Sequence, residues 1–93
     1  MNRRAKMVVR SITVTNSVGL HARPATYFIQ EANKYKSSIS VKKDQRKVNA
    51  KSLLGVLSLG VVQGMTIEIE AEGVDENEAI EGLAALVDNG FAE

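Results

Sequence analysis

The sequence predicts a two-layer α+β fold in which an antiparallel sheet is covered by helices on one face. A chain of 93 residues suits one hydrophobic core. Some segments alternate apolar and polar residues, as half-buried strands do, while others place apolar residues at helical spacing. A sheet with helices on one side buries both kinds of surface. We therefore expect one domain over residues 1–93, in the order β-α-β-β-α-β-α.

The first half of the chain predicts a strand, a helix and a hairpin. Residues 11–15 alternate polar and apolar and predict a strand that begins a few residues earlier, and residues 16–19 are turn material. A helix from Ala22 to about Asn33 is predicted because Ala25, Phe28, Ile29 and Ala32 fall at helical spacing. Pro24 suits its first turn. Residues 39–41 and 48–50 predict two further strands, joined by a charged hairpin turn over residues 42–47.

The second half predicts a short helix, a strand and a last helix. Residues 52–60 are apolar, with Ser52 in the N-cap position and Gly60 at the end. Residues 65–72 alternate most regularly and predict the fourth strand. Asp75 is predicted to cap the last helix, with Glu78 completing a capping-box-like pair. The buried stripe of this helix is predicted to be Ile80, Leu83, Ala84 and Val87, and Gly90 to end it.

Composition excludes several classes of site. With no cysteine there is neither a disulfide nor a thiolate metal site, and a single histidine makes structural zinc improbable, so no metal and no cofactor are expected. The apolar stretch before Arg10 is too short for a signal peptide or a membrane span, which favours a cytoplasmic protein without membrane insertion.

Charge is distributed unevenly along the chain. All twelve Lys and Arg lie in residues 1–51 with two acidic residues, while residues 52–93 hold nine acidic residues and no basic one. Such asymmetry can mark a nucleic-acid surface, or one face built from the early elements. Only 4% of the residues are aromatic, which leaves few rings to stack on bases, so no direct nucleic-acid partner is expected.

The first candidate site is the segment of residues 19–25, Gly-Leu-His-Ala-Arg-Pro-Ala. His21 stands where a loop meets a helix start, whose free N–H groups favour an anion. Arg23 adds a planar cation for phosphate oxygens. Neutral imidazole is a nucleophile near neutral pH, and its phosphoryl adduct can be passed on. The alternative is that His21 only caps or packs.

Two further candidates lie in the short helix. Ser52 is sufficiently explained as an N-cap, and the alternative is a phosphorylation site. The cluster Leu53, Leu54, Val56 and Leu57 is more apolar surface than so short a helix can bury. Either all four belong to the core, or an exposed remainder forms a patch on which a partner docks.

These three features together resemble the HPr family, the histidine-containing phosphocarriers of the bacterial sugar phosphotransferase system. Residues 19–25 resemble its active-site signature, and residues 48–60 its second signature, around a regulatory serine. The resemblance spans nearly the whole chain and leaves residues 1–6 mostly outside, as a basic N-terminal extension. It implies an open-faced β-sandwich, in which three helices cover one face of a four-stranded antiparallel sheet.

The resemblance also implies roles for individual residues. Enzyme I, charged by phosphoenolpyruvate, would phosphorylate Nδ1 of His21, and the group would pass to enzyme IIA domains of sugar permeases. Arg23 would stabilise the phosphate, and Pro24 and the backbone of Ala22 would shape the loop. The implied docking residues are Leu53, Leu54 and Leu57, with Thr26 and Gln30 bordering the interface. The chain would be a stoichiometric carrier rather than an enzyme, and a monomer, since one face must meet several partners in turn.

Ser52 matches the serine that an ATP-dependent kinase/phosphorylase modifies in some relatives. There the phosphoserine form binds a catabolite-control transcription factor and is a poor substrate for Enzyme I. A paralogue without the active histidine retains only this role; the presence of His21 disfavours that assignment, but a purely regulatory module acting through Ser52 is the alternative function. Val18 departs from the family, since relatives often carry a small polar residue there.

Overall fold

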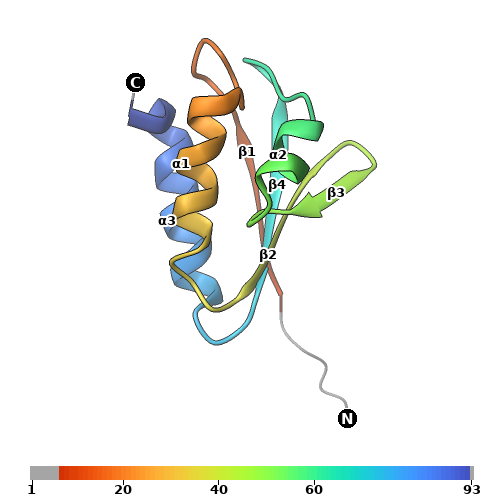
Figure 1. The fold of residues 1–93 in the computed structure, drawn as a ribbon. Helices are drawn as coiled ribbons and strands as arrows, with labels where there is room; N and C mark the ends of the chain where they lie inside the picture. The colour runs from red at the N-terminus through yellow and green to blue at the C-terminus, as the bar shows by residue number, and fades with distance from the viewer. Residues whose placement is uncertain (1–6, 93) are drawn as a thin grey trace.

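The computed structural model describes residues 7–92, and the predicted extension of residues 1–6 lies outside this range. Seven main elements and a short 3₁₀ turn follow one another in the predicted order (Figure 1). Their bounds are β1 Val8–Thr13, α1 Ala22–Ala32, β2 Ser38–Lys43, β3 Arg46–Asn49, α2 Leu53–Ser58, β4 Thr66–Glu72, α3 Glu76–Asp88 and η1 Gly90–Ala92.

The four strands form one antiparallel sheet in the order β1-β4-β2-β3. The first strand therefore pairs with the last, and β4 lies between β1 and β2. Side chains that are level with one another share a face of the sheet. One face carries the apolar members of each strand, with Val41 opposite Ile69, and the other is polar, with Ser11 and Lys42 opposite Glu68.

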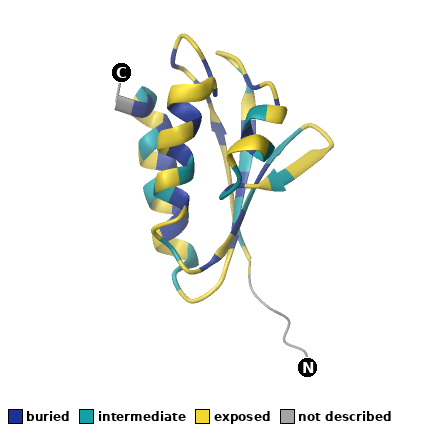
Figure 2. Cartoon of the chain, in the orientation of Figure 1, coloured by how far each residue is buried: buried dark blue, intermediate teal, exposed yellow. Residues whose placement is uncertain are grey.

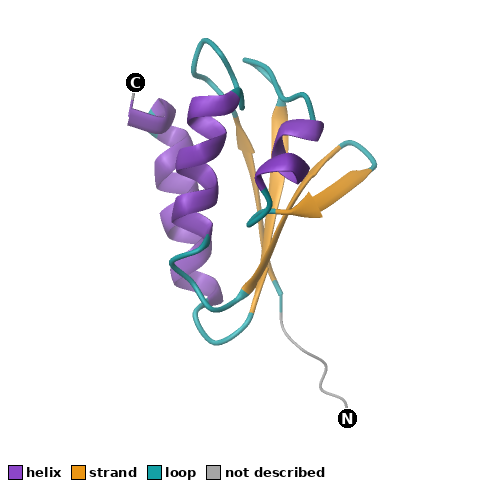
Figure 3. Cartoon of the chain, in the orientation of Figure 1, coloured by secondary structure: helices purple, strands orange, loops and turns teal. Residues whose placement is uncertain are grey.

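The helices pack on the apolar face of the sheet (Figure 3). The last helix, α3, contacts β1 and β4, while α1 lies against α3 on one side and α2 on the other. Figure 2 shows each long helix buried along the side that faces its neighbours and exposed on its outer side. The predicted stripe of α3 is buried, as are Ala25, Phe28 and Ala32 of α1. The family's expected architecture is thus confirmed.

The predicted hairpin turn over residues 42–47 is wrong. The two strands continue through it, so that Lys42 pairs with Lys47 and Lys43 with Arg46. Only residues 44–45 form the turn, and Asp44 takes the left-handed conformation, with φ of +56°. A two-residue loop is the commonest hairpin connection, and long charged side chains are tolerated at an exposed sheet edge.

Other strand boundaries shift by a few residues. The first strand does begin before residue 11, but it ends at Thr13, after which the N–H of Val14 donates to the carbonyl of Met65 (2.9 Å). The third strand ends at Asn49, although the N–H of Ala50 still donates to the carbonyl of Ile39 (3.0 Å). Strand ends are set by the length of the partner strand, which local sequence does not contain.

The predicted capping box of the last helix is also wrong. Asp75 occupies the N-cap position of α3 but makes no side-chain bond to the helix. Its carboxylate instead accepts bonds from the backbone N–H of Lys36 (2.9 Å) and from the N–H (2.9 Å) and hydroxyl (2.5 Å) of Ser37. The hydroxyl and these N–H groups hold the pKa of Asp75 below its usual value. Asp75 therefore ties the α1–β2 loop to the start of α3.

The C-terminal end contributes a core residue that helical periodicity did not predict. Gly90 does end α3, but Phe91 then turns back with φ of +59° and is fully buried. No helix among residues 7–92 is long and apolar enough to cross a membrane.

Candidate functional site

The loop that carries His21 is fastened to the segment before β4. The N–H of Leu20 donates to the carbonyl of Val61 (3.0 Å), and the Leu20 side chain is buried in the core. Gly19 has φ of +64°, and a side chain there would overlap the carbonyl oxygen of Val61 and lie 2.6 Å from the Cα of Val62. The side-chain amide of Asn16 donates to the carbonyl of Gly19 (2.8 Å). The backbone leading to His21 is therefore held on both sides.

His21 is itself the N-cap residue of α1. Its backbone is extended, with φ of −76° and ψ of −175°, and its carbonyl accepts the N–H of Ala25 (2.8 Å). The imidazole makes no capping bond and is exposed. The first N–H groups of a helix have no partner within it, so those of Ala22 and Arg23 remain available at the same end. His21 therefore caps α1 through its backbone carbonyl and not through its imidazole, and it does not pack in the core.

Arg23 is held by a tyrosine one turn further along the helix. Its Nε donates to the hydroxyl of Tyr27 (3.2 Å), and its guanidinium lies 6.0 Å from the centre of the Tyr27 ring. This hydrogen bond raises the pKa of Arg23 above its ordinary value. An arginine side chain is in any case a cation at all physiological pH values. Sequence reasoning missed Tyr27, although the i, i+4 spacing of the pair was a signal that could have found it.

The other residues of this segment divide between structural and exposed positions. Pro24 is buried in the first turn of α1, where it shapes the helix start. The hydroxyl of Thr26 donates to the carbonyl of Ala22 (2.8 Å), so its donor is used within the helix. Gln30 is exposed one turn beyond Thr26.

Ser52 caps α2 as predicted. Its hydroxyl oxygen accepts the N–H of Gly55 (3.1 Å), and the serine is only partly exposed. A cap of this kind satisfies one of the free donors at a helix start. The structural explanation of Ser52 as an N-cap is confirmed.

The leucines of α2 are divided between core and solvent. Val56 is completely buried and Leu57 is partly buried against the core, whereas Leu53 is 40% and Leu54 80% exposed. The expectation of an exposed apolar remainder is thus confirmed, and the alternative in which all four are buried is wrong. His21 stands at the start of α1, and α2 lies beside α1 (Figure 1). The exposed leucines are therefore on the helix next to the one that carries the histidine.

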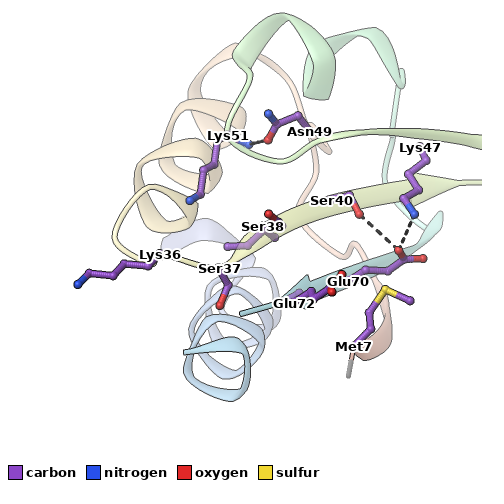
Figure 4. A pocket seen from close by; sticks show the side chains of 12 residues that line it. Met7, Lys36, Ser37, Ser38, Ser40, Lys47, Asn49, Lys51, Glu70 and Glu72 are labelled. Atoms are coloured by element: carbon purple, nitrogen blue, oxygen red, sulfur yellow. Dashed lines mark hydrogen bonds and ion pairs between the residues drawn. The ribbon is translucent and has the colours of Figure 1, made fainter. Parts of the chain in front are cut away.

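A shallow hollow of about 400 Å³ lies elsewhere, on the sheet (Figure 4). None of the predicted site residues lines it. Three of its charged side chains already have partners within the protein. Lys47 pairs with Glu70 (2.9 Å), and Lys51 Nζ donates to the carbonyl of Tyr35 (2.7 Å). The Ser40 hydroxyl also donates to Glu70 (3.4 Å). Within residues 7–92, no three His, Cys, Asp or Glu side chains gather as metal ligands.

Comparison with known proteins identifies the family. The family model described as the PTS HPr component phosphorylation site matches residues 8–89. The HPr-like protein Crh of Halalkalibacterium halodurans is 48% identical over 88% of this chain and 98% of its own. A crystal structure of HPr-C-His from Thermoanaerobacter tengcongensis matches with a TM-score of 0.91 at 50% identity, over 92% of this chain and 97% of that one. A crystal structure of an HPr dimer from the same organism matches at 0.76 and 52% identity, over 88% and 94%. This chain belongs to the HPr family.

Proposed function

We propose that this chain is a phosphocarrier of the sugar phosphotransferase system, in which His21 accepts a phosphoryl group from phospho-Enzyme I and donates it to enzyme IIA domains. The observation that carries the proposal is the exposed imidazole at the N-cap of α1, where the first helix N–H groups have no partner within the helix and Arg23 follows two residues later. A nucleophile, an anion-favouring helix end and a fixed cation are the elements that transfer of a phosphoryl group requires.

The transfer is a simple exchange of bonds at phosphorus. The lone pair of Nδ1 of neutral His21 attacks the phosphoryl group held by Enzyme I, and the bond to Enzyme I breaks as the N–P bond forms. The Nε2 proton stays on the ring. Arg23 and the helix N–H groups stabilise charge on the phosphoryl oxygens. Transfer to an enzyme IIA domain reverses these steps and regenerates His21, so the chain is a carrier and not a catalyst.

The exposed leucines supply the surface on which these partners dock. Leu54 projects into solvent for most of its area, and Leu53 and Leu57 flank it on α2. Exposing these apolar side chains to water is unfavourable, and burying them in a partner's pocket lowers the free energy. Thr26 and Gln30, exposed on α1, border this interface.

Ser52 provides a second level of control in this proposal. A kinase/phosphorylase would add a phosphate at the start of α2, bringing about −1.5 to −2 charges beside the leucine surface. That charge would weaken docking of Enzyme I and present the chain to a catabolite-control transcription factor. The alternative, a purely regulatory module acting through Ser52, is favoured by the similarity to Crh and disfavoured by the exposed His21.

The protein is proposed to work in the cytoplasm as a monomer, because one face has to meet several partners in turn. The dimer formed by an HPr of Thermoanaerobacter tengcongensis makes the oligomeric state worth measuring, by light scattering on the purified chain. A stable dimer that covers α2 would contradict this part of the proposal.

The test is phosphorylation of the pure protein by Enzyme I and phosphoenolpyruvate. An adduct that is labile in acid, stable in alkali and absent from His21→Ala supports the relay. Ser52→Ala is the matched control and should be phosphorylated normally, since it leaves His21 intact. If wild-type protein formed no adduct while Enzyme I phosphorylated a control carrier, the regulatory alternative would replace the relay.

A further inference from the structure

Within residues 7–92, the Tyr27 hydroxyl makes one side-chain hydrogen bond, to Arg23 of the proposed site (3.2 Å). We propose that Tyr27 is a positioning residue, which holds the Arg23 guanidinium at the start of α1 with both terminal nitrogens free for the phosphoryl group. This inference rests on the proposed function, because it assigns how Arg23 is made ready for the phosphate on His21.

The geometry of the pair follows from the helix. Residues four apart are neighbours on the surface of a helix, so the Tyr27 ring can reach the Arg23 side chain. Arg23 Nε donates to the Tyr27 hydroxyl (3.2 Å), and Arg23 Cζ lies 6.0 Å from the centre of the Tyr27 ring. Within residues 7–92 the Arg23 side chain makes this one hydrogen bond, so Nη1 and Nη2 keep their donors for a ligand.

Positioning matters because Arg23 is exposed. A free arginine on the surface samples many rotamers, and ordering it in the transition state costs conformational entropy. Tyr27 has only two side-chain torsions and is 37% exposed, so it is the less mobile member of the pair. An arginine already held in place loses less entropy when the phosphoryl group arrives, which speeds the step.

The competing explanation is that Tyr27 touches the partner directly. Its ring is exposed on α1, the helix beside α2 and its leucines, and interface tyrosines often contribute to docking. The two explanations differ in one respect. A residue that works through Arg23 loses its influence once Arg23 is removed, whereas a docking residue keeps it.

A double-mutant cycle decides between them. Transfer from phospho-Enzyme I is measured in single turnovers for wild type, Tyr27→Phe, Arg23→Ala and the double variant. Tyr27→Phe keeps the ring and removes the hydroxyl, so it should slow the step about two- to fivefold at saturating Enzyme I, the value of one exposed hydrogen bond. It should leave KM unchanged, and should cause no further slowing in the Arg23→Ala background. Losses that multiply in the double variant, or a change confined to KM, would overturn the inference.

Two controls complete the design. Tyr35→Phe removes the same hydroxyl from another tyrosine, which bonds Glu31 (2.6 Å) and not Arg23, and should leave the transfer rate unchanged. The Nε–H resonance of Arg23 in a nuclear magnetic resonance spectrum should shift toward that of a free arginine in Tyr27→Phe. An unchanged resonance would show that the contact is not made in solution. It would overturn the inference about Tyr27 but not the proposed function. A wild-type chain that accepts no phosphoryl group would overturn the proposed function, and the role of Tyr27 with it.

Discussion

The backbone at Gly19 runs so close to the segment before β4 that replacing it with alanine should be strongly destabilising. The left-handed conformation, with φ of +64°, costs an alanine about 1–2 kcal/mol. The new Cβ would also overlap the carbonyl oxygen of Val61 and lie 2.6 Å from the Cα of Val62. Relieving this overlap by moving backbone costs about 1–3 kcal/mol more, and stretches the bond between Leu20 N–H and Val61. We expect the free energy of unfolding to fall by about 2–5 kcal/mol in total.

Gly60 offers a matched control for the conformational part of this cost. Its φ is +63°, almost identical to that of Gly19, but a Cβ there would meet nothing within 4 Å. Gly60→Ala should therefore show the backbone penalty alone, about 1–2 kcal/mol.

The assay is equilibrium unfolding in urea, followed by circular dichroism for both variants and wild type. With a slope of about 1–2 kcal/mol per molar, an excess cost of 2 kcal/mol places the midpoint of Gly19→Ala about 1–2 M below that of Gly60→Ala. Equal midpoints would refute the argument from close approach. The same displacement should slow phosphorylation of His21 in Gly19→Ala, because the loop that carries the histidine moves.

Three further predictions concern other parts of the structure. Ser52→Ala removes the cap of α2 and should lower the free energy of unfolding by about 1 kcal/mol in a urea titration, whereas Ser52→Asp keeps an acceptor there and should cost less. Leu54→Ala should change the free energy of unfolding by less than about 0.5 kcal/mol but weaken Enzyme I binding in calorimetry. Val56→Ala should lower the free energy of unfolding by about 2–3 kcal/mol. Equal losses in the two variants would contradict the division of α2 into core and surface. The hydrogen bond to Glu31 raises the pKa of Tyr35 to about 12, above the ordinary 10.0, so its contribution to stability is complete below pH 10.0 and is lost as pH rises through about 12. Unfolding of Tyr35→Phe should lack this loss, and a wild-type phenolate absorbance with a midpoint at the ordinary pKa would contradict it.

Local patterning predicted most of the fold correctly. The stripe of α3 is buried because helical spacing puts its members on one side of the helix, wherever that helix packs. The cap at Ser52 was predictable for the same reason, since its partner, Gly55, is three residues away. The chemistry of the site was also local: His21 and Arg23 share one loop and one helical turn.

Apart from the hairpin turn, whose partners are close in the chain, the errors arose where a residue's partner is distant. Asp75 looked like the start of a capping box, but its carboxylate is taken by Ser37 of the α1–β2 loop. Phe91 follows the end of a helix, so helical periodicity does not predict its burial. It is nevertheless buried in the core, because its backbone adopts a left-handed conformation.

By itself, the sequence determined which segments become helices and strands and which residues stand at the start of α1, because those properties depend on neighbours within a turn or two. Only the tertiary structure decided that Leu54 faces solvent while Val56 is buried, and that Gly19 is pressed against Val61. The physical reason is that exposure and close approach are set by packing between distant segments. Local free energies do not contain that packing.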